Sequence, residues 1–194
     1  MRQYLLTLWT FIDPVYFRFT RLTYLRNYHS RDNIFRVRLT SYMGRNVTLA
    51  DGTQINKHDT LVKIHLHNVK LLNELKHTGN DFKKGKLIYK YVQKSLPDIA
   101  TYIQEHPDSS RIKGIIGITL LNRATERLGF ESVSISHPVY KWFKWASLLP
   151  IVLLSTNDMS FKKIIKQPAP RYLFMSKNTL TKRYNPTQDA GLVK

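Results

Sequence analysis

The sequence predicts an α+β domain, in which a small, mainly antiparallel sheet carries helices packed on one face and an amphipathic aromatic helix forms the N-terminus. Residues 34–39 and 61–67 alternate apolar with polar or charged side chains, a pattern typical of half-buried strands. Residues 81–104 and 137–155 instead repeat apolar side chains at helical spacing. A tight turn at Gly52 lies between two β-rich segments, which favours antiparallel pairing in the first half of the chain.

Length and composition predict one folded domain that carries a strong positive charge. The chain has 194 residues, of which 42% are hydrophobic and 12% aromatic, enough for a packed core. We expect the domain over residues 1–184, with an amphipathic helical segment at 1–28 and a flexible tail at 185–194. The absence of cysteine excludes disulfides and thiolate metal sites. The formal net charge of +18 indicates a polyanionic partner, which could be an anionic membrane surface, an anionic envelope polymer or nucleic acid.

The N-terminal segment has the spacing of an amphipathic helix. Arg18 and Arg21 lie opposite an apolar face formed by Leu5, Leu8, Trp9, Ile12, Tyr16, Phe19 and Thr23. The apolar run is short, Asp13 and Pro14 interrupt it, and no cleavage site follows, so a signal peptide is not expected. Since a membrane span needs about 20 apolar residues, no transmembrane helix is expected either. The helix can lie on a membrane or pack on its own domain, and the sequence leaves both alternatives open.

The next segments predict a small antiparallel meander. In residues 34–39 the apolar side chains alternate with Arg36 and Arg38, which should share a solvent-exposed face. Residues 47–49 form a second short strand, and the turn at Asp51 and Gly52 follows it.

Residues 61–67 predict a strand with two different faces. One face carries Leu61, Lys63, His65 and His67, and the other carries Val62, Ile64 and Leu66. The purely apolar face should point to the core. Asn68 then occupies an N-cap position ahead of a helix over residues 69–75. Polar groups therefore gather at a strand-to-helix corner.

The corner suggests candidate catalytic residues but no complete catalytic motif. His65 could act as a general acid or base with Asp59 orienting its ring, and Asn68 follows three positions later at the start of the next helix. His65 and His67 could also ligate a metal, but a metal site needs a third ligand that the sequence does not fix. No serine elbow, phosphate loop or carboxylate pair is present, so we expect no metal and no cofactor, and a binding role is favoured over an enzyme.

The second half of the chain predicts a long helix followed by a strand, a helix and a strand. Pro97 marks a kink or a junction in the helical residues 81–104. Residues 112–118 could form a strand, residues 119–128 should be helical, and Gly129 should end that helix ahead of an extended segment at 133–135. A helix-turn-helix is the rival interpretation, because small, turn and apolar residues fall near that motif's positions at Thr125, Gly129 and Ile135.

Residues 137–155 contain four aromatic residues, two of them tryptophan. A helix there places one apolar face opposite Lys141 and Lys144, and that face comprises Val139, Trp142, Phe143, Ala146 and Leu149. This face could pack in the core or lie on a membrane interface. Asp158 should cap a short helix at 161–166. An extended segment at 171–175 follows, with Ser176 capping a last helix.

Several motifs resemble the signature of the YkoP-like family of Gram-positive bacteria over nearly the whole chain. They are Asp51, Gly52 and Thr53, then Asp59, Ile64, His65, Leu66 and Asn68, then residues 117–121 with Arg123, and residues 127–130. In that family the domain occurs alone or after a polysaccharide deacetylase domain, which implies an envelope or polysaccharide context. The chain lacks the deacetylase's Thr-Phe-Asp-Asp metal motif and histidine pair, so the resemblance does not imply deacetylation. Relatives often lack histidine at the position of His67, which weighs against a metal pair with His65.

Together these observations predict a basic accessory or binding protein of the cell envelope, cytoplasmic and peripheral at the membrane. Its expected partner is an anionic membrane surface or anionic polymer. The residues expected to contact it are Arg2, Trp9, Arg18, Arg21, Arg36, Arg38, Lys141 and Lys144. Two alternatives stay open: an enzyme on an envelope polysaccharide or lipid-linked substrate with His65 as acid or base, and a nucleic-acid-binding protein.

Overall fold

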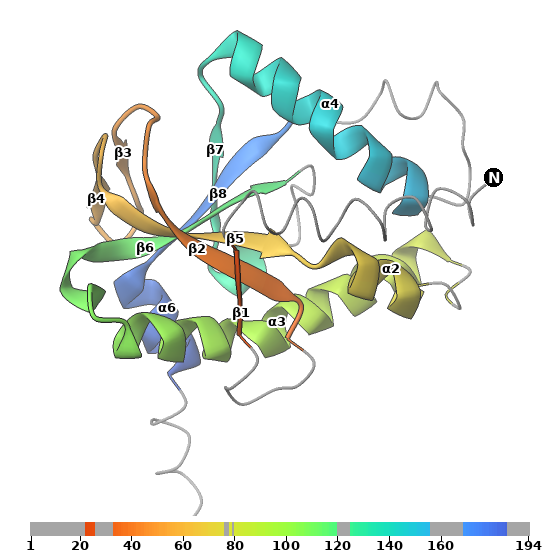
Figure 1. The fold of residues 1–194 in the computed structure, drawn as a ribbon, viewed down its shortest axis with the longest axis horizontal. Coiled ribbons are helices and arrows are strands. Elements are labelled where there is room, and N and C mark those ends of the chain that lie inside the picture. The colour runs from red at the N-terminus through yellow and green to blue at the C-terminus, as the bar shows by residue number, and fades with distance from the viewer. Residues whose placement is uncertain are drawn as a thin grey trace, which may run out of the picture.

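A computed structural model describes residues 22–25, 33–75, 78, 80–119, 125–155 and 169–185 (Figure 1). Most of the expected N-terminal helix, the short helix at 161–166 and the tail beyond Asn185 lie outside the described residues. The elements are β1 (Thr23–Tyr24), β2 (Phe35–Ser41), β3 (Val47–Thr48), β4 (Gln54–Ile55), β5 (Thr60–Leu66), α2 (Asn68–Leu75), α3 (Asp81–Glu105), η1 (Ser109–Arg111), β6 (Ile112–Thr119), η2 (Glu126–Leu128), β7 (Glu131–Ser134), α4 (Pro138–Ser155), β8 (Arg171–Ser176) and α6 (Lys177–Tyr184).

Six strands form one mixed sheet in the order β1-β2-β5-β6-β8-β7. Only the β5–β6 pair is parallel among these strands, so the prediction of a mainly antiparallel arrangement is confirmed. The parallel pair arises because α2 and α3 carry the chain back across the sheet between β5 and β6, as a crossover connection requires. β3 and β4 form a separate two-stranded hairpin. Thr23, expected in the N-terminal helix, belongs to β1, which pairs with β2.

One face of the sheet packs against α3 and α6. Val62 and Ile64 of β5 enter a core with Ile99 of α3 and Leu180 of α6, and the four residues are buried or nearly so. The prediction that the Val62 side of β5 points inward is therefore confirmed. Burying such side chains supplies most of the stabilisation of a domain of this size.

The other face is covered as well, which corrects the expectation of helices on one face only. Leu61 and Phe174 pack there in a second cluster beneath the β3–β4 hairpin. The ring of Tyr140, in the first turn of α4, stacks on Tyr172 of β8 with centroids 6.5 Å apart. Figure 1 shows α4 on the opposite side of the sheet from α3 and α6. Stacking of these two aromatic rings holds the start of α4 over this face.

Helix α3 runs unbroken through Pro97, so of the two expected alternatives, a kink or a junction of two helices, the junction is excluded. Its N-terminus is capped by Asn80, whose side chain accepts a hydrogen bond from the amide of Phe82. Asn33 donates a hydrogen bond of 2.7 Å to the buried carboxylate of Asp98, which ties the start of β2 to the middle of α3.

The segment that suggested a helix-turn-helix forms strands instead. Residues up to Thr119 belong to β6, and the helical part after it is confined, among the described residues, to the 3-10 turn η2. Gly129 ends that turn with a left-handed φ of 89°, as predicted. β7 follows and pairs antiparallel with β8, which excludes a recognition helix in residues 131–134.

The last helix begins where the sequence predicts. The hydroxyl of Ser176 accepts a hydrogen bond of 2.9 Å from the amide of Thr179 and so caps α6. The carboxylate of Asp51 in turn accepts hydrogen bonds from the hydroxyls of Ser176 and Thr179. Asp51 therefore ties the β3–β4 hairpin to α6, which is a structural role.

Two glycine-to-alanine substitutions should change stability in opposite directions. Gly129→Ala places a side chain on a residue whose φ of 89° suits glycine, next to the side chain of Arg183, and should lower the free energy of unfolding by about 1–2 kcal/mol. Gly85→Ala lies on an exposed, open position inside α3 and should raise it by about 0.5–1 kcal/mol. Urea unfolding followed by circular dichroism measures both changes. Equal changes in the free energy of unfolding would contradict the claim that the left-handed conformation of residue 129 requires glycine.

Candidate functional site

A group of basic side chains lies on the sheet face that α4 covers. Arg36 and Arg38 of β2 are directly opposite His65 and Lys63 of β5 in the antiparallel register. Opposite residues in such a pair project from the same face and lie close together. The prediction that the two arginines share a face is confirmed, but that face is not solvent-exposed, because Arg36 is 2% exposed and the other three are half-buried.

Helix α4 adds a fifth basic residue to this group. Lys144 is half-buried, and its charge acts on both Lys63 and His65. We refer to these residues as the basic cluster, which comprises Arg36, Arg38, Lys63, His65 and Lys144. The cluster brings together β2, β5 and α4, which are far apart in the sequence.

Aromatic rings hold parts of the cluster in place. The guanidinium of Arg36 lies 4.9 Å from the ring centroid of Tyr24, in a cation–π contact. The same tyrosine meets the ring of His67 edge-on at 5.8 Å, so β1 forms one border of the cluster. On the opposite border the ammonium of Lys144 lies 5.4 Å from the ring centroid of Tyr140.

Burial and like charges lower the pKa values within the cluster. Burial, followed by the charges of Lys144 and Arg38, lowers the pKa of Lys63 to about 8. Burial lowers the pKa of His65 to about 3, with further lowering by the four basic neighbours. The imidazole is therefore neutral at neutral pH. A pKa of about 3 makes it a poor general acid or base there, since effective catalytic groups titrate near the working pH.

The carboxylate of Asp59, which the sequence paired with His65, makes its contact elsewhere. Asp59 precedes β5 and accepts a hydrogen bond of 2.7 Å from the amide of Asn56. His65 lies six positions after Asp59 along extended chain, which corresponds to about 20 Å. The structure therefore does not bring Asp59 to the imidazole. Glu131, on the hairpin side, accepts from the amide of Ala50.

The backbone of Asn68 lies at the start of α2, shortly after the end of β5. It is the first residue of α2 rather than the residue before it, because the carbonyl of His67 accepts the hydrogen bond from the amide of Leu71. Its side chain lies outside the described part of the structure. Within the described residues, no three side chains of histidine, aspartate or glutamate are placed to hold a metal ion.

The outer side of α4 exposes large apolar side chains. Val139, Trp142 and Phe143 are 69%, 68% and 59% exposed, and their spacing places them on one face of the helix. We refer to these three residues as the α4 stripe. The sequence left core packing and a membrane interface open for this face, and the structure shows these three side chains exposed to solvent. The neighbouring Lys141 and Trp145 are half-buried.

The remaining predicted contact residues lie outside the described part of the chain; they are Arg2, Trp9, Arg18 and Arg21. Lys63, Trp142 and Phe143 were not among the predicted site residues. The alternation of β5 already placed Lys63 beside His65, and the spacing of α4 grouped the aromatic residues. The missing signal was the position of α4 relative to the sheet.

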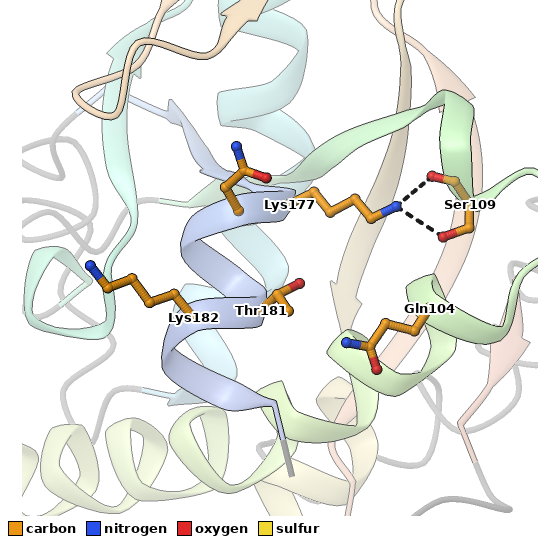
Figure 2. A pocket seen from close by; sticks show the side chains of 6 residues that line it. Gln104, Ser109, Lys177, Thr181 and Lys182 are labelled. Atoms are coloured by element: carbon orange, nitrogen blue, oxygen red, sulfur yellow. Dashed lines mark hydrogen bonds between the residues drawn. The ribbon is translucent and has the colours of Figure 1, made fainter. Parts of the chain in front are cut away.

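A separate hollow lies where α3, η1 and α6 meet, and residues with polar side chains line it (Figure 2). It is lined by Gln104, Ser109, Lys177, Asn178, Thr181 and Lys182. The ammonium of Lys177 donates to the carbonyl and the hydroxyl of Ser109 at 2.7 and 2.9 Å. These bonds fasten η1 to the start of α6, so that lysine has a structural role.

Comparisons with known proteins identify relatives of the chain, and these relatives do not indicate a catalysed reaction. A profile of the YkoP domain matches residues 2–184. The chain is 45% identical over 184 residues to "Uncharacterized protein YkoP" of Bacillus subtilis (strain 168), an alignment covering 95% of this chain and 98% of that protein. No solved structure matches the chain. The resemblance seen in the motifs is thereby confirmed.

Acidification should destabilise the fold through His65. Its pKa is about 3 in the folded protein, against an ordinary value of 6.5. The unfolded chain therefore takes up the proton first, and the free energy of unfolding falls between pH 6.5 and pH 3, by about 2 kcal/mol from pH 7 to pH 5. His65→Gln should remove this part of the loss, as measured by urea unfolding at both pH values.

The exposed His58 provides the control for this measurement. His58 has a left-handed φ of 74°, which asparagine tolerates, so His58→Asn should keep the pH dependence of the wild type. If His65→Gln lost as much free energy of unfolding between pH 7 and pH 5 as the wild type, His65 would not be the cause of the acid destabilisation.

Proposed function

The chain belongs to the YkoP domain family, and we propose that this member is a binding protein that attaches peripherally to an anionic membrane surface through α4. The observation that carries the proposal is the α4 stripe. Two bulky aromatic side chains and a valine lie exposed on one helix face, beside lysines, in a strongly basic chain. Exposed apolar groups rimmed by polar residues mark interaction surfaces.

The chemistry of α4 fits an interfacial helix. Tryptophan and phenylalanine enter the boundary between headgroups and acyl chains, while lysines remain at the level of the headgroups. Lys144 lies 5.7 Å from the ring centroid of Phe143, so positive charge sits directly beside the stripe. In the described part of the chain no helix is long and apolar enough to cross a membrane, and the proposal requires none.

The net charge supplies long-range attraction that the stripe alone lacks. Each basic residue close to an anionic leaflet contributes about 1 kcal/mol, and salt screens that attraction beyond about 8 Å. Burying one of the exposed aromatic side chains contributes about 1.5–3 kcal/mol more. Attachment should therefore need both anionic lipid and the stripe.

The two other functions have less support from these observations. An enzyme that uses His65 as acid or base would need a pKa near the working pH, but that pKa is lowered to about 3. A nucleic-acid-binding protein would use the same positive charge, and its aromatic residues would stack on bases. An anionic envelope polymer also carries the required charge but gives the apolar stripe no apolar phase to enter.

Replacing the aromatic residues of the stripe should abolish membrane attachment without unfolding the protein. We expect Trp142→Ser with Phe143→Ser to weaken binding to vesicles of phosphatidylcholine with phosphatidylglycerol by at least about tenfold. Wild-type binding should rise with the content of phosphatidylglycerol and fall with salt. Vesicle co-sedimentation measures the binding, and circular dichroism checks the fold of the variant.

Phe82 offers a matched control on another helix. It is 80% exposed on α3, so Phe82→Ser removes an exposed aromatic ring without touching the stripe and should leave vesicle binding unchanged. Equal loss of binding in both variants would contradict the role of α4. Wild-type protein that ignores anionic vesicles at low salt but binds duplex DNA or an anionic polymer would overturn the membrane proposal.

A further inference from the structure

We propose that the outward face of α3 binds a single-stranded nucleic acid. This face, called here the α3 lysine face, carries five exposed side chains, which are Phe82, Lys83, Lys86, Lys90 and Lys94. Membrane attachment through the α4 stripe does not require it, because α3 and α4 lie on opposite sides of the sheet (Figure 1). The two proposals can therefore fail separately.

Helical spacing places these five side chains on one side of α3. At 3.6 residues per turn they fall within an arc of about 120° and extend over about 18 Å of the helix. Leu96, Ile99 and Ile103 of the same helix are buried in the core on its other side. The α3 lysine face therefore points away from the sheet, toward solvent.

The charge of this face is of one sign. Lys86, Lys90 and Lys94 follow one another at intervals of four residues, and like charges at that spacing destabilise a helix. Acidic residues border the stretch at either end, but within residues 82–104 the acidic residue is Asp98, which is buried. A solvated helix face usually mixes both signs, since opposite charges at this spacing stabilise it. An extended polyanion would neutralise the whole row of lysines at once.

The ring of Phe82 favours a nucleic acid over a polyanion without bases. Its side chain is 80% exposed and lies about one turn before Lys86. Proteins that bind single strands combine basic side chains along the backbone with aromatic rings on which bases stack. The bases of a duplex are stacked on one another, so a ring at the protein surface reaches base faces only in a single strand.

The α3 lysine face leads toward the polar hollow at the C-terminal end of the helix (Figure 2). Gln104 falls within the same arc of α3 and lines that hollow together with Lys177 and Lys182 of α6. Lys182 is exposed and adds positive charge there. A strand that follows α3 toward its C-terminus would therefore meet further hydrogen-bond donors.

Removing the row of charge should weaken binding and reduce its dependence on salt. We expect Lys86→Gln with Lys90→Gln and Lys94→Gln to lower the affinity for a fluorescent oligothymidine of about 15 nucleotides by at least about tenfold. Each lost phosphate contact should make the slope of log affinity against log salt less steep by about 0.7, so the three should reduce it by about 2. Fluorescence anisotropy at several salt concentrations measures both quantities. Glutamine has a helix propensity close to that of lysine, and circular dichroism checks the fold.

A second triple variant controls for the overall charge. Arg45→Gln with Lys57→Gln and Lys113→Gln removes the same charge from exposed residues outside α3, and it should keep the affinity and the slope close to those of the wild type. Both triple variants should bind anionic vesicles equally, because neither alters the α4 stripe. Equal losses of oligothymidine binding in the two triple variants would show general electrostatic attraction and overturn the site.

Phe82→Leu tests the contribution of the bases. This change removes the aromatic ring and no charge, so it should lower the affinity for oligothymidine at least about fivefold and leave the salt slope unchanged. Binding of inorganic polyphosphate, a chain without bases, should be the same in this variant as in the wild type. An unchanged affinity for oligothymidine in Phe82→Leu would overturn the proposal. Tighter binding of duplex DNA than of the single strand, or no binding of oligothymidine by the wild type at low salt, would overturn it as well.

Discussion

The two-residue alternation of β5 is the constraint on which the rest of the structure depends. Val62 and Ile64 point into the core against α3, so Lys63 and His65 must point to the opposite face. A shift of one residue in register would place the basic side chains in the apolar core. The strong burial of one face therefore fixes where the positive charges gather on the other.

The opposite face carries charged side chains beside its apolar cluster. Its basic cluster gathers positive charge under α4, and burial lowers the pKa of Lys63 and of His65. The lowered pKa of His65 makes the fold sensitive to acid, because the unfolded chain binds that proton before the folded protein does.

Helix α4 connects the basic cluster with the exposed α4 stripe. Tyr140 and Lys144 lie on its inner side, at the sheet, while Trp142 and Phe143 lie on its exposed side. Among the described side chains of α4, aromatic residues therefore occur both at the sheet and on the exposed side. The stack of Tyr140 on Tyr172 gives the start of the helix an anchor on the sheet that does not involve the stripe.

The sequence by itself determined the local structure: the alternation of β5, the left-handed end at Gly129, the cap at Ser176 and the overall basic charge. Each depends on neighbours a few residues apart, which periodicity and turn chemistry report directly. The tertiary structure alone decided that α4 covers the second face, that Lys144 joins Lys63, and that Asp59 stays away from His65. These outcomes depend on packing between segments distant in the chain, and no local pattern encodes which face a helix will cover.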